Sequence, residues 1–236
     1  MEFDSRALKE VQETRLLIYH LDAWLCRSIT PYIGDRVLEV GSGMGNILQF
    51  LLAPDRDLVI GTDIDHACVD YLQEKYQDQQ NVLVFPCDVC HPDFRRLKKY
   101  HIDTVVSINV LEHIQDDELA LAQISEIVAA GGHIILVLPA HKYLFGSMDR
   151  SIGHYRRYDK QSLYHKLSKH HLEVLNQKYL NPVGALGWFV NGRVLHKKVP
   201  PTGQLKLFNR LMPLVCQLDD HFNSPFGLSI LSISRM

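Results

Sequence analysis

Residues 87–91 read CDVCH and place three candidate ligands, Cys87, Cys90 and His91, within five positions. The C-x-x-C-H pattern is typical of covalent haem attachment, and thiolate and imidazole groups also suit zinc. No fourth zinc ligand is evident nearby, and the N-terminal stretch MEFDSRALKEVQETR lacks the cationic start and apolar core of a secretory signal. The five cysteines are mostly dispersed, as is usual for reduced thiols. We therefore expect a cytoplasmic protein in which this stretch binds neither haem nor a metal.

A second group of residues suits a nucleotide-type ligand. The stretch VLEVGSGMGN, residues 37–46, predicts a strand, a glycine-rich turn and a helix, with Glu39 inside the strand. Gly41, Gly43 and Gly45 allow the backbone to turn tightly and to approach a ligand. Their G-x-G-x-G spacing differs from the dinucleotide-binding pattern G-x-G-x-x-G. Taken alone, the turn is explained equally well as a tight connection between strand and helix.

Acidic residues end the next two predicted strands. Asp63 lies 18 residues after Gly45, and Asp88 lies inside CDVCH. Ligands of open α/β sheets bind outside the carboxyl ends of the strands. A carboxylate there can accept both hydroxyls of a ribose, or an exocyclic adenine amine, whereas Asp65 fits better as a helix N-cap. The stretch SINVLEHI (107–114) ends a fourth strand, where we expect the reacting end of the ligand.

The elements that must position these residues alternate along the chain. Apolar runs predict strands at 36–40, 57–65, 81–88, from 103, and at 133–140, 172–180 and 227–235. Helical spacing predicts helices at 6–29, 46–52, 66–76 and 116–132. Continuous apolar strands between helices indicate an α/β fold whose parallel sheet is covered on both faces. We expect one domain, 1–236, with an N-terminal helical cap (about 1–30) and a helical insertion (about 181–222).

Together, LEVGSGMGN, GTDID, PCDV and INVLEHI closely resemble the motifs of class I S-adenosylmethionine-dependent methyltransferases over residues 36–140. The resemblance implies a Rossmann-like, mostly parallel sheet of seven strands with the last strand antiparallel. It implies S-adenosyl-L-methionine as cofactor, with S-adenosyl-L-homocysteine as product. By this resemblance, Asp63 binds the ribose and Asp88, rather than the cysteines beside it, binds the adenine amine. The cofactor residues that it implies are Glu39, Gly41, Gly43, Gly45, Asn46, Asp63, Ile64, Asp88, Val89 and Asn109.

Residues 139–163 gather aromatic and titratable side chains directly after the fifth strand. Without a function, these residues would form a solvated loop whose arginines pair with Asp149 and Asp159. The GHYRRY segment (153–158) resembles a branch known mainly as bacterial small-molecule methyltransferases. Histidine suits proton removal from an acceptor because its pKa lies near neutrality. The candidate catalytic residues are His154, His141, His113 and Tyr158, although a structural hydrogen bond competes as the role of His113.

We expect methyl transfer by in-line displacement to a small-molecule acceptor under a roof made by the cap and the insertion. One alternative is a non-catalytic module that uses 181–222 at a membrane or partner. A dinucleotide-dependent oxidoreductase is disfavoured by the glycine spacing. The formal net charge of −2 argues against nucleic acid, and no apolar run approaches the roughly 18 residues of a membrane span. The sequence leaves peripheral membrane contact, the oligomeric state and the methylated atom open.

Overall fold

The computed structural model describes residues 19–199, 201, 203, 204, 208, 210, 211, 215, 216 and 224–236. Positions 6–18 of the predicted first helix and 217–222 of the predicted insertion lie outside the described residues. One sheet holds seven strands in the order β3-β2-β1-β4-β5-β7-β6, and β7 runs antiparallel to both neighbours. The expected sheet is thus confirmed. Its strands are β1 Arg36–Val40, β2 Leu58–Asp63, β3 Val82–Pro86, β4 Ile102–Ile108, β5 Val128–Pro139, β6 Glu173–Leu180 and β7 Ser229–Arg235.

Helices cover both faces of the sheet because successive strand side chains point to opposite sides. On one face, Val37 and Val106 pack with apolar residues of α2 (Tyr19–Ile29), α3 (Leu48–Leu51) and α4 (His66–Lys75). On the other face, Leu38 and Val105 pack against η3 (Pro92–Tyr100), α5 (Asp117–Ile127) and α7 (Lys160–Lys169). Two apolar layers therefore clamp the sheet and fix the positions of its strand ends.

Two predicted helices are shorter than their sequence patterns suggest. The helix expected at 46–52 spans only Leu48–Leu51, because the glycine turn extends through Ile47. The helix expected at 116–132 ends at Ile127, and β5 begins directly with Val128, which pairs with Ile102 of β4. The boundary between α5 and β5 is set by the pairing of Val128 with Ile102. The following AAGG stretch gives no sign of it in the sequence.

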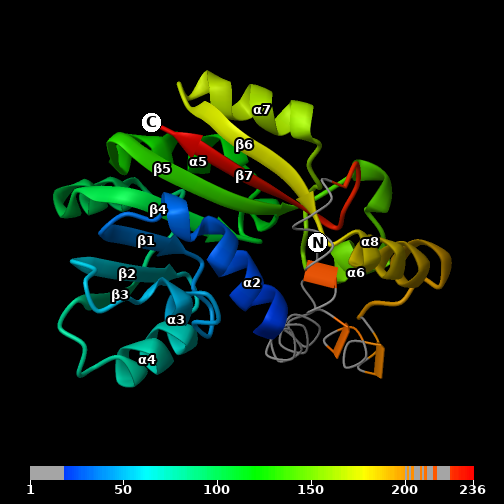
Figure 1. Cartoon of the computed structure of the whole chain (residues 1–236), viewed down its shortest axis with the longest axis horizontal. Helices are drawn as coiled ribbons and strands as arrows, with labels where there is room; N and C mark the ends of the chain where they lie inside the picture. Colours follow the sequence, from blue (N-terminus) through cyan, green and yellow to red (C-terminus); the bar gives the residue numbers. More distant parts are fainter. Residues whose placement is uncertain are drawn as a thin grey trace.

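The carboxyl edge of the sheet is covered by the segments that follow β5 and β6. Figure 1 shows α6 (Ser147–Ser151) and α8 (Pro182–Trp188) together, beyond the end of β6 and the start of β7. A π-helical turn, η6 (Phe189–Val194), continues α8 and packs on α6. The GHYRRY segment returns to this edge, since the Tyr158 N–H donates to the Pro139 carbonyl and the His141 N–H donates to that of Tyr158. The loop after β5 thus folds back beside its own start.

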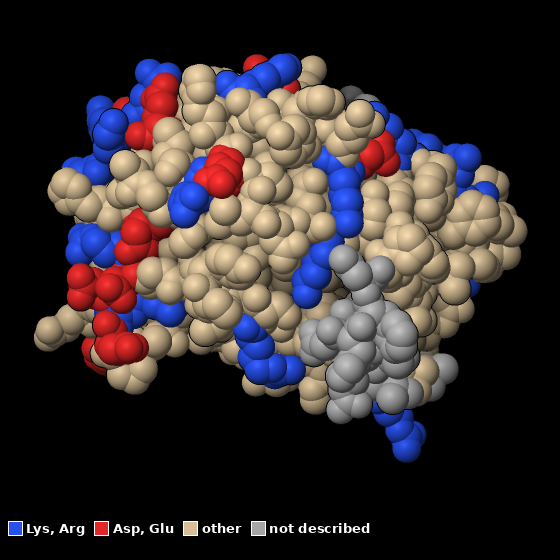
Figure 2. Space-filling view, turned by 45° about the horizontal axis from the view of Figure 1, so that its top comes forward, with Lys and Arg blue, Asp and Glu red and all other residues tan. Residues whose placement is uncertain are grey.

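Figure 2 shows acidic and basic side chains mixed on the left of one face, with several basic side chains across its centre and right. Among the described residues, no helix combines the length and apolarity needed to cross a bilayer.

Candidate active site

The turn after β1 has the backbone geometry that its glycines allow. Gly41, Gly43 and Gly45 all have positive φ, at 77°, 50° and 78°. A side chain at Gly41 would collide with Val110, since a Cβ there would lie 2.4 Å from its Cγ2 atom. A Cβ on Gly43 would meet nothing within 4 Å. The turn therefore packs against the loop after β4 on one side and is open at Gly43.

Asp63, at the end of β2, holds this turn in place. Its Oδ2 atom accepts from the Gly43 N–H at 2.7 Å, and its Oδ1 atom accepts from the Asp65 N–H at 2.9 Å. Asp65 in turn caps α4 by accepting from the Ala67 N–H, which confirms its predicted N-cap role. The neighbouring Ile64 side chain is 73% exposed. This edge thus combines a carboxylate, an open backbone turn and an apolar surface.

In the CDVCH stretch, Asp88 faces solvent, whereas Cys90 and His91 contact backbone groups of the protein. Asp88 is exposed and accepts from the Cys90 N–H, whereas Val89 is buried. The Cys90 thiol points to the Asp116 carbonyl, and His91 caps η3 by accepting from the Asp93 N–H. Burial, followed by the charge of Asp88, raises the pKa of both thiols, which disfavours the thiolate that a metal needs.

The remaining predicted cofactor residues share the same edge. Glu39 is buried near the end of β1, where it pairs with Gly61 of β2 and Val106 of β4. Asn46 lies in the last part of the glycine turn and is half-buried. Asn109 follows β4 with φ of 53°, and its N–H donates to the Val137 carbonyl. The sequence therefore located the strand ends that surround the glycine turn.

A cavity of about 60 Å³ lies beneath α2 at this edge. Leu21, Asp22 and Leu25 of α2 line one side of it. The other side is formed by residues at or near the ends of β4 to β7: Ile108, Asn109, Val137, Leu180 and Ser229. The size of the cavity suits one end of a ligand rather than a whole drug-sized molecule. A larger hollow of about 500 Å³ adjoins Arg56 and Asn81, before β2 and β3, at the opposite edge from the glycine turn.

Two of the four predicted catalytic residues come together. The His113 and His154 rings meet edge to face with centroids 4.7 Å apart. Glu112, which is fully buried, places Oε1 3.8 Å from the His154 Nε2 atom. Ligand atoms of Glu112, His113 and His154 all lie within 4.8 Å of one another. The LEHI stretch and the GHYRRY segment thus build one polar cluster.

Asp149 is the hub behind this cluster. Its carboxylate accepts from four donors: His154 Nδ1 at 3.0 Å, Arg157 Nε at 2.7 Å, the Gly146 N–H at 2.8 Å and Trp188 Nε1 at 3.0 Å. Burial alone would raise the pKa of Asp149, but the hydrogen bond with His154 and the charge of Arg157 lower it to about 2. Pairing of the arginines with Asp149 is the expectation for a solvated loop, but here both Arg157 and Asp149 are buried. The roles of Glu112 and Trp188 were missed, because only the folded chain shows them.

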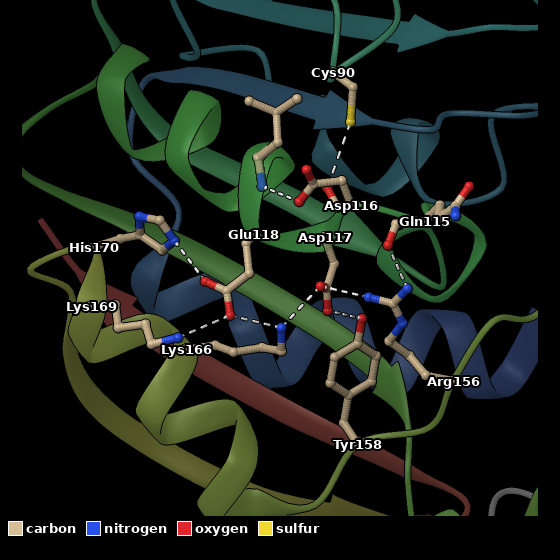
Figure 3. A network of polar contacts seen from close by, with 11 residues as sticks. Cys90, Gln115, Asp116, Asp117, Glu118, Arg156, Tyr158, Lys166, Lys169 and His170 are labelled. Carbon is tan, nitrogen blue, oxygen red and sulfur yellow. Dashed lines mark hydrogen bonds and ion pairs between the residues drawn. The ribbon is translucent and has the colours of Figure 1, made fainter.

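The other half of GHYRRY belongs to a separate network on α5 (Figure 3). The Tyr158 hydroxyl donates to Asp117 at 2.8 Å, and the side chain of Tyr158 is 2% exposed. Arg156 and Lys166 pair with the same carboxylate at 2.6 and 2.9 Å. Burial and then the charge of Asp117 raise the pKa of Tyr158 far above its usual value. This geometry gives the Tyr158 hydroxyl a structural partner in Asp117.

His141 also occupies a structural position. Its backbone has φ of 61°, and its Nε2 atom accepts from the Gly227 N–H at 3.3 Å. The ring packs between Tyr143 and Tyr179, at centroid distances of 5.0 and 4.5 Å. Burial lowers the pKa of His141. The residue ties the end of β5 to the start of β7.

Sequence comparisons find known proteins that are similar to part of the chain. Residues 38–134 match the model of a methyltransferase domain. A probable polyketide synthase 41 of Dictyostelium discoideum is 25% identical over 141 residues, which are 50% of this chain and 6% of that protein. The tRNA U34 carboxymethyltransferase of Alteromonas mediterranea is 29% identical over 124 residues, or 48% of this chain and 36% of that protein. The chain therefore spans only a minor part of these relatives.

Solved structures resemble the whole fold. Geranyl diphosphate methyltransferase in complex with S-adenosylmethionine aligns with a TM-score of 0.64 at 12% identity, covering 90% of this chain and 84% of that one. The [4+2]-cyclase SpnF aligns with a TM-score of 0.60 at 13% identity, covering 90% and 80%. Similarity at this level concerns the fold alone. Residues 38–134 thus match a methyltransferase domain, and the fold of the chain is that of solved methyltransferases.

Proposed function

We propose that this chain transfers a methyl group from S-adenosylmethionine to a small-molecule acceptor. The observation that carries the proposal is the open backbone turn at Gly43, which Asp63 holds by a hydrogen bond. This turn lies within residues 38–134, which match a methyltransferase domain. The absence of a side chain at Gly43 leaves room for a ligand against the backbone. Asp63 and the exposed Asp88 supply carboxylate acceptors on neighbouring strand ends. The residues present thus fit the cofactor.

When bound, S-adenosylmethionine supplies a methyl group that is already activated on a sulfonium. Asp63 would accept the ribose hydroxyls while it keeps the turn in register. Ile64 would offer an apolar face to the adenine, and Asp88 would accept from its amine. Asn109 and the buried Glu39 would face the methionine portion. The chemical task left to the chain is to align the acceptor and to exclude water.

The acceptor side is proposed to lie between α2 and the His113–His154 cluster. The α2 helix covers the cavity at the ends of β4, β5 and β6, and α8 reaches the cluster through the hydrogen bond from Trp188 to Asp149. His154 has its Nδ1 atom held by Asp149, so its Nε2 atom is available to a proton or ligand. Such a held imidazole suits removal of a proton from an acceptor hydroxyl or amine.

Calorimetry tests the cofactor assignment. S-adenosylhomocysteine should bind and NAD should not. Asp63→Ala should weaken binding by about 1–3 kcal/mol, because the ribose hydroxyls lose their acceptor and the turn loses its anchor. Asp57→Ala is the matched control, since Asp57 precedes the same strand at its other end and is exposed. Equal binding by Asp63→Ala and Asp57→Ala would remove Asp63 from the site.

The acceptor is sought by incubating the protein with S-adenosylmethionine and a panel of metabolites. Mass spectrometry should detect a product heavier by one methylene unit, together with S-adenosylhomocysteine. Formation of that product without S-adenosylmethionine, or cofactor binding with no transfer to any hydroxyl, amine or carbon acid in the panel, would count against a small-molecule methyltransferase.

A further inference from the structure

We propose that Glu112, His113 and His154 form a binding site for one zinc-class divalent cation. These side chains come from two stretches some forty residues apart, 112–113 after β4 and 154 in the returning loop. Their ligand atoms lie within 4.8 Å of one another, and the structure brings them together without any cysteine. Two imidazoles and one carboxylate are a ligand set of zinc sites that keep a position open for a further ligand.

The orientation of His154 supports this assignment. Its Nδ1–H donates to Asp149 at 3.0 Å, which fixes the tautomer and leaves the Nε2 lone pair directed at Glu112. A carboxylate that holds the far nitrogen of a metal-binding histidine is the usual second contact in zinc proteins. Asp149 is itself fixed by Arg157 and by the Trp188 indole. The imidazole is therefore held in one orientation before any ligand arrives.

The cluster is compact and shielded from solvent. The His154 Nε2 atom and the Glu112 Oε1 atom lie 3.8 Å apart, Glu112 is fully buried and His154 is 8% exposed. Ligand atoms around zinc lie roughly 3–3.5 Å apart, given metal–ligand distances of about 2.0–2.2 Å. A modest contraction of the cluster would suffice.

The half-buried His113 leaves the cluster accessible from one side. A cation there could take a water molecule or an acceptor oxygen as its fourth ligand and lower the pKa of a bound hydroxyl. This role toward an acceptor rests on the proposed methyl transfer, whereas cation binding itself does not. Nitrogen ligands favour zinc over magnesium, which prefers oxygen.

Calorimetric titration of the chelator-treated full chain with zinc chloride tests the site. We expect one zinc per chain, a visible ligand-field absorption with cobalt in its place, and no displacement by magnesium. His113→Ala and the isosteric Glu112→Gln should each weaken zinc binding at least about tenfold, because each removes a ligand or its charge. Both variants retain the contact between His154 and Asp149, so they are expected to fold.

Two controls separate this site from other zinc ligands in the chain. The double variant Cys87→Ser, Cys90→Ser and the variant His165→Ala, at an exposed position of α7, should bind zinc like the parent chain. No zinc binding by the parent would overturn the proposal. Loss of zinc in the cysteine double variant, or unchanged binding in both site variants, would also overturn it. Titration of the same samples with S-adenosylhomocysteine reports on the proposed function separately.

Discussion

Among the described carboxylates near the loop after β5, Asp149 accepts the most hydrogen bonds. Its four hydrogen bonds join His154, Arg157, the start of α6 and the indole of α8. The guanidinium of Arg157 also donates to the Ala140 carbonyl, and the residue is only 3% exposed. A buried guanidinium is tolerated because a carboxylate balances its charge. One side chain thus sets the position of the histidine cluster and anchors the insertion.

The first residue-scale prediction is that Asp149→Asn destabilises the protein by about 3–5 kcal/mol at neutral pH, because Arg157 stays buried and charged without its partner. Urea unfolding monitored by circular dichroism measures the change. Asp78→Asn, at an exposed position, should change the free energy of unfolding by less than about 0.5 kcal/mol. A loss below about 1 kcal/mol for Asp149→Asn would show that the network is not coupled as described.

Cys87 and Cys90 provide a second prediction at this scale. Burial and the charge of Asp88 raise the pKa of both thiols above the ordinary value of 9.0, so little thiolate forms near neutrality. Both should react with iodoacetamide more slowly than free cysteine at pH 8, and faster as the pH rises beyond 9. Peptide mass spectrometry gives the rate at each site. Zinc should not protect either thiol, and protection would favour a metal site in CDVCH.

At the scale of elements, the sequence predicted the strands better than their connections. Continuous apolar runs identify β1 to β5, since central strands such as β1, β2 and β4 are buried on both faces. Acids at strand ends locate one edge of the sheet. The meeting of Glu112 with His154 was not predictable, because it depends on a loop that folds back and on the backbone pairing of Tyr158 with Pro139. The place of β7 between β5 and β6 likewise reflects long-range pairing.

The α2 helix gives a prediction at this scale. Leu21→Trp should fill the cavity beneath α2, since Leu21 lines it together with Asn109 and Leu180. For the acceptor found in the metabolite panel, we expect a higher KM or a lower kcat, with cofactor affinity within about twofold of the parent. Tyr19→Trp is the control, because Tyr19 lies on the same helix and is 52% exposed. Normal kinetics for Leu21→Trp would place the acceptor elsewhere.

At the scale of the whole molecule, the fold admits more than one chemistry, because a [4+2]-cyclase and a geranyl diphosphate methyltransferase share it. The acceptor class therefore has to be argued from surfaces rather than from topology. One relative acts on tRNA by its name, and a nucleic-acid acceptor requires a basic surface that neutralises phosphates. This chain has a formal net charge of −2, and the face in Figure 2 carries both acidic and basic side chains.

The last prediction follows from that charge distribution. Fluorescence anisotropy with labelled tRNA should give a Kd weaker than about 10⁻⁴ M at physiological salt, which is the weak end of ordinary non-specific binding. Because few phosphates would be neutralised, affinity should change little between 50 and 200 mM salt, whereas six to ten phosphate contacts would cost about 10³- to 10⁵-fold. S-adenosylhomocysteine should not increase the affinity, since the proposed cofactor edge presents the carboxylates of Asp63 and Asp88. Micromolar binding with a steep salt dependence would instead assign a nucleic acid as the acceptor.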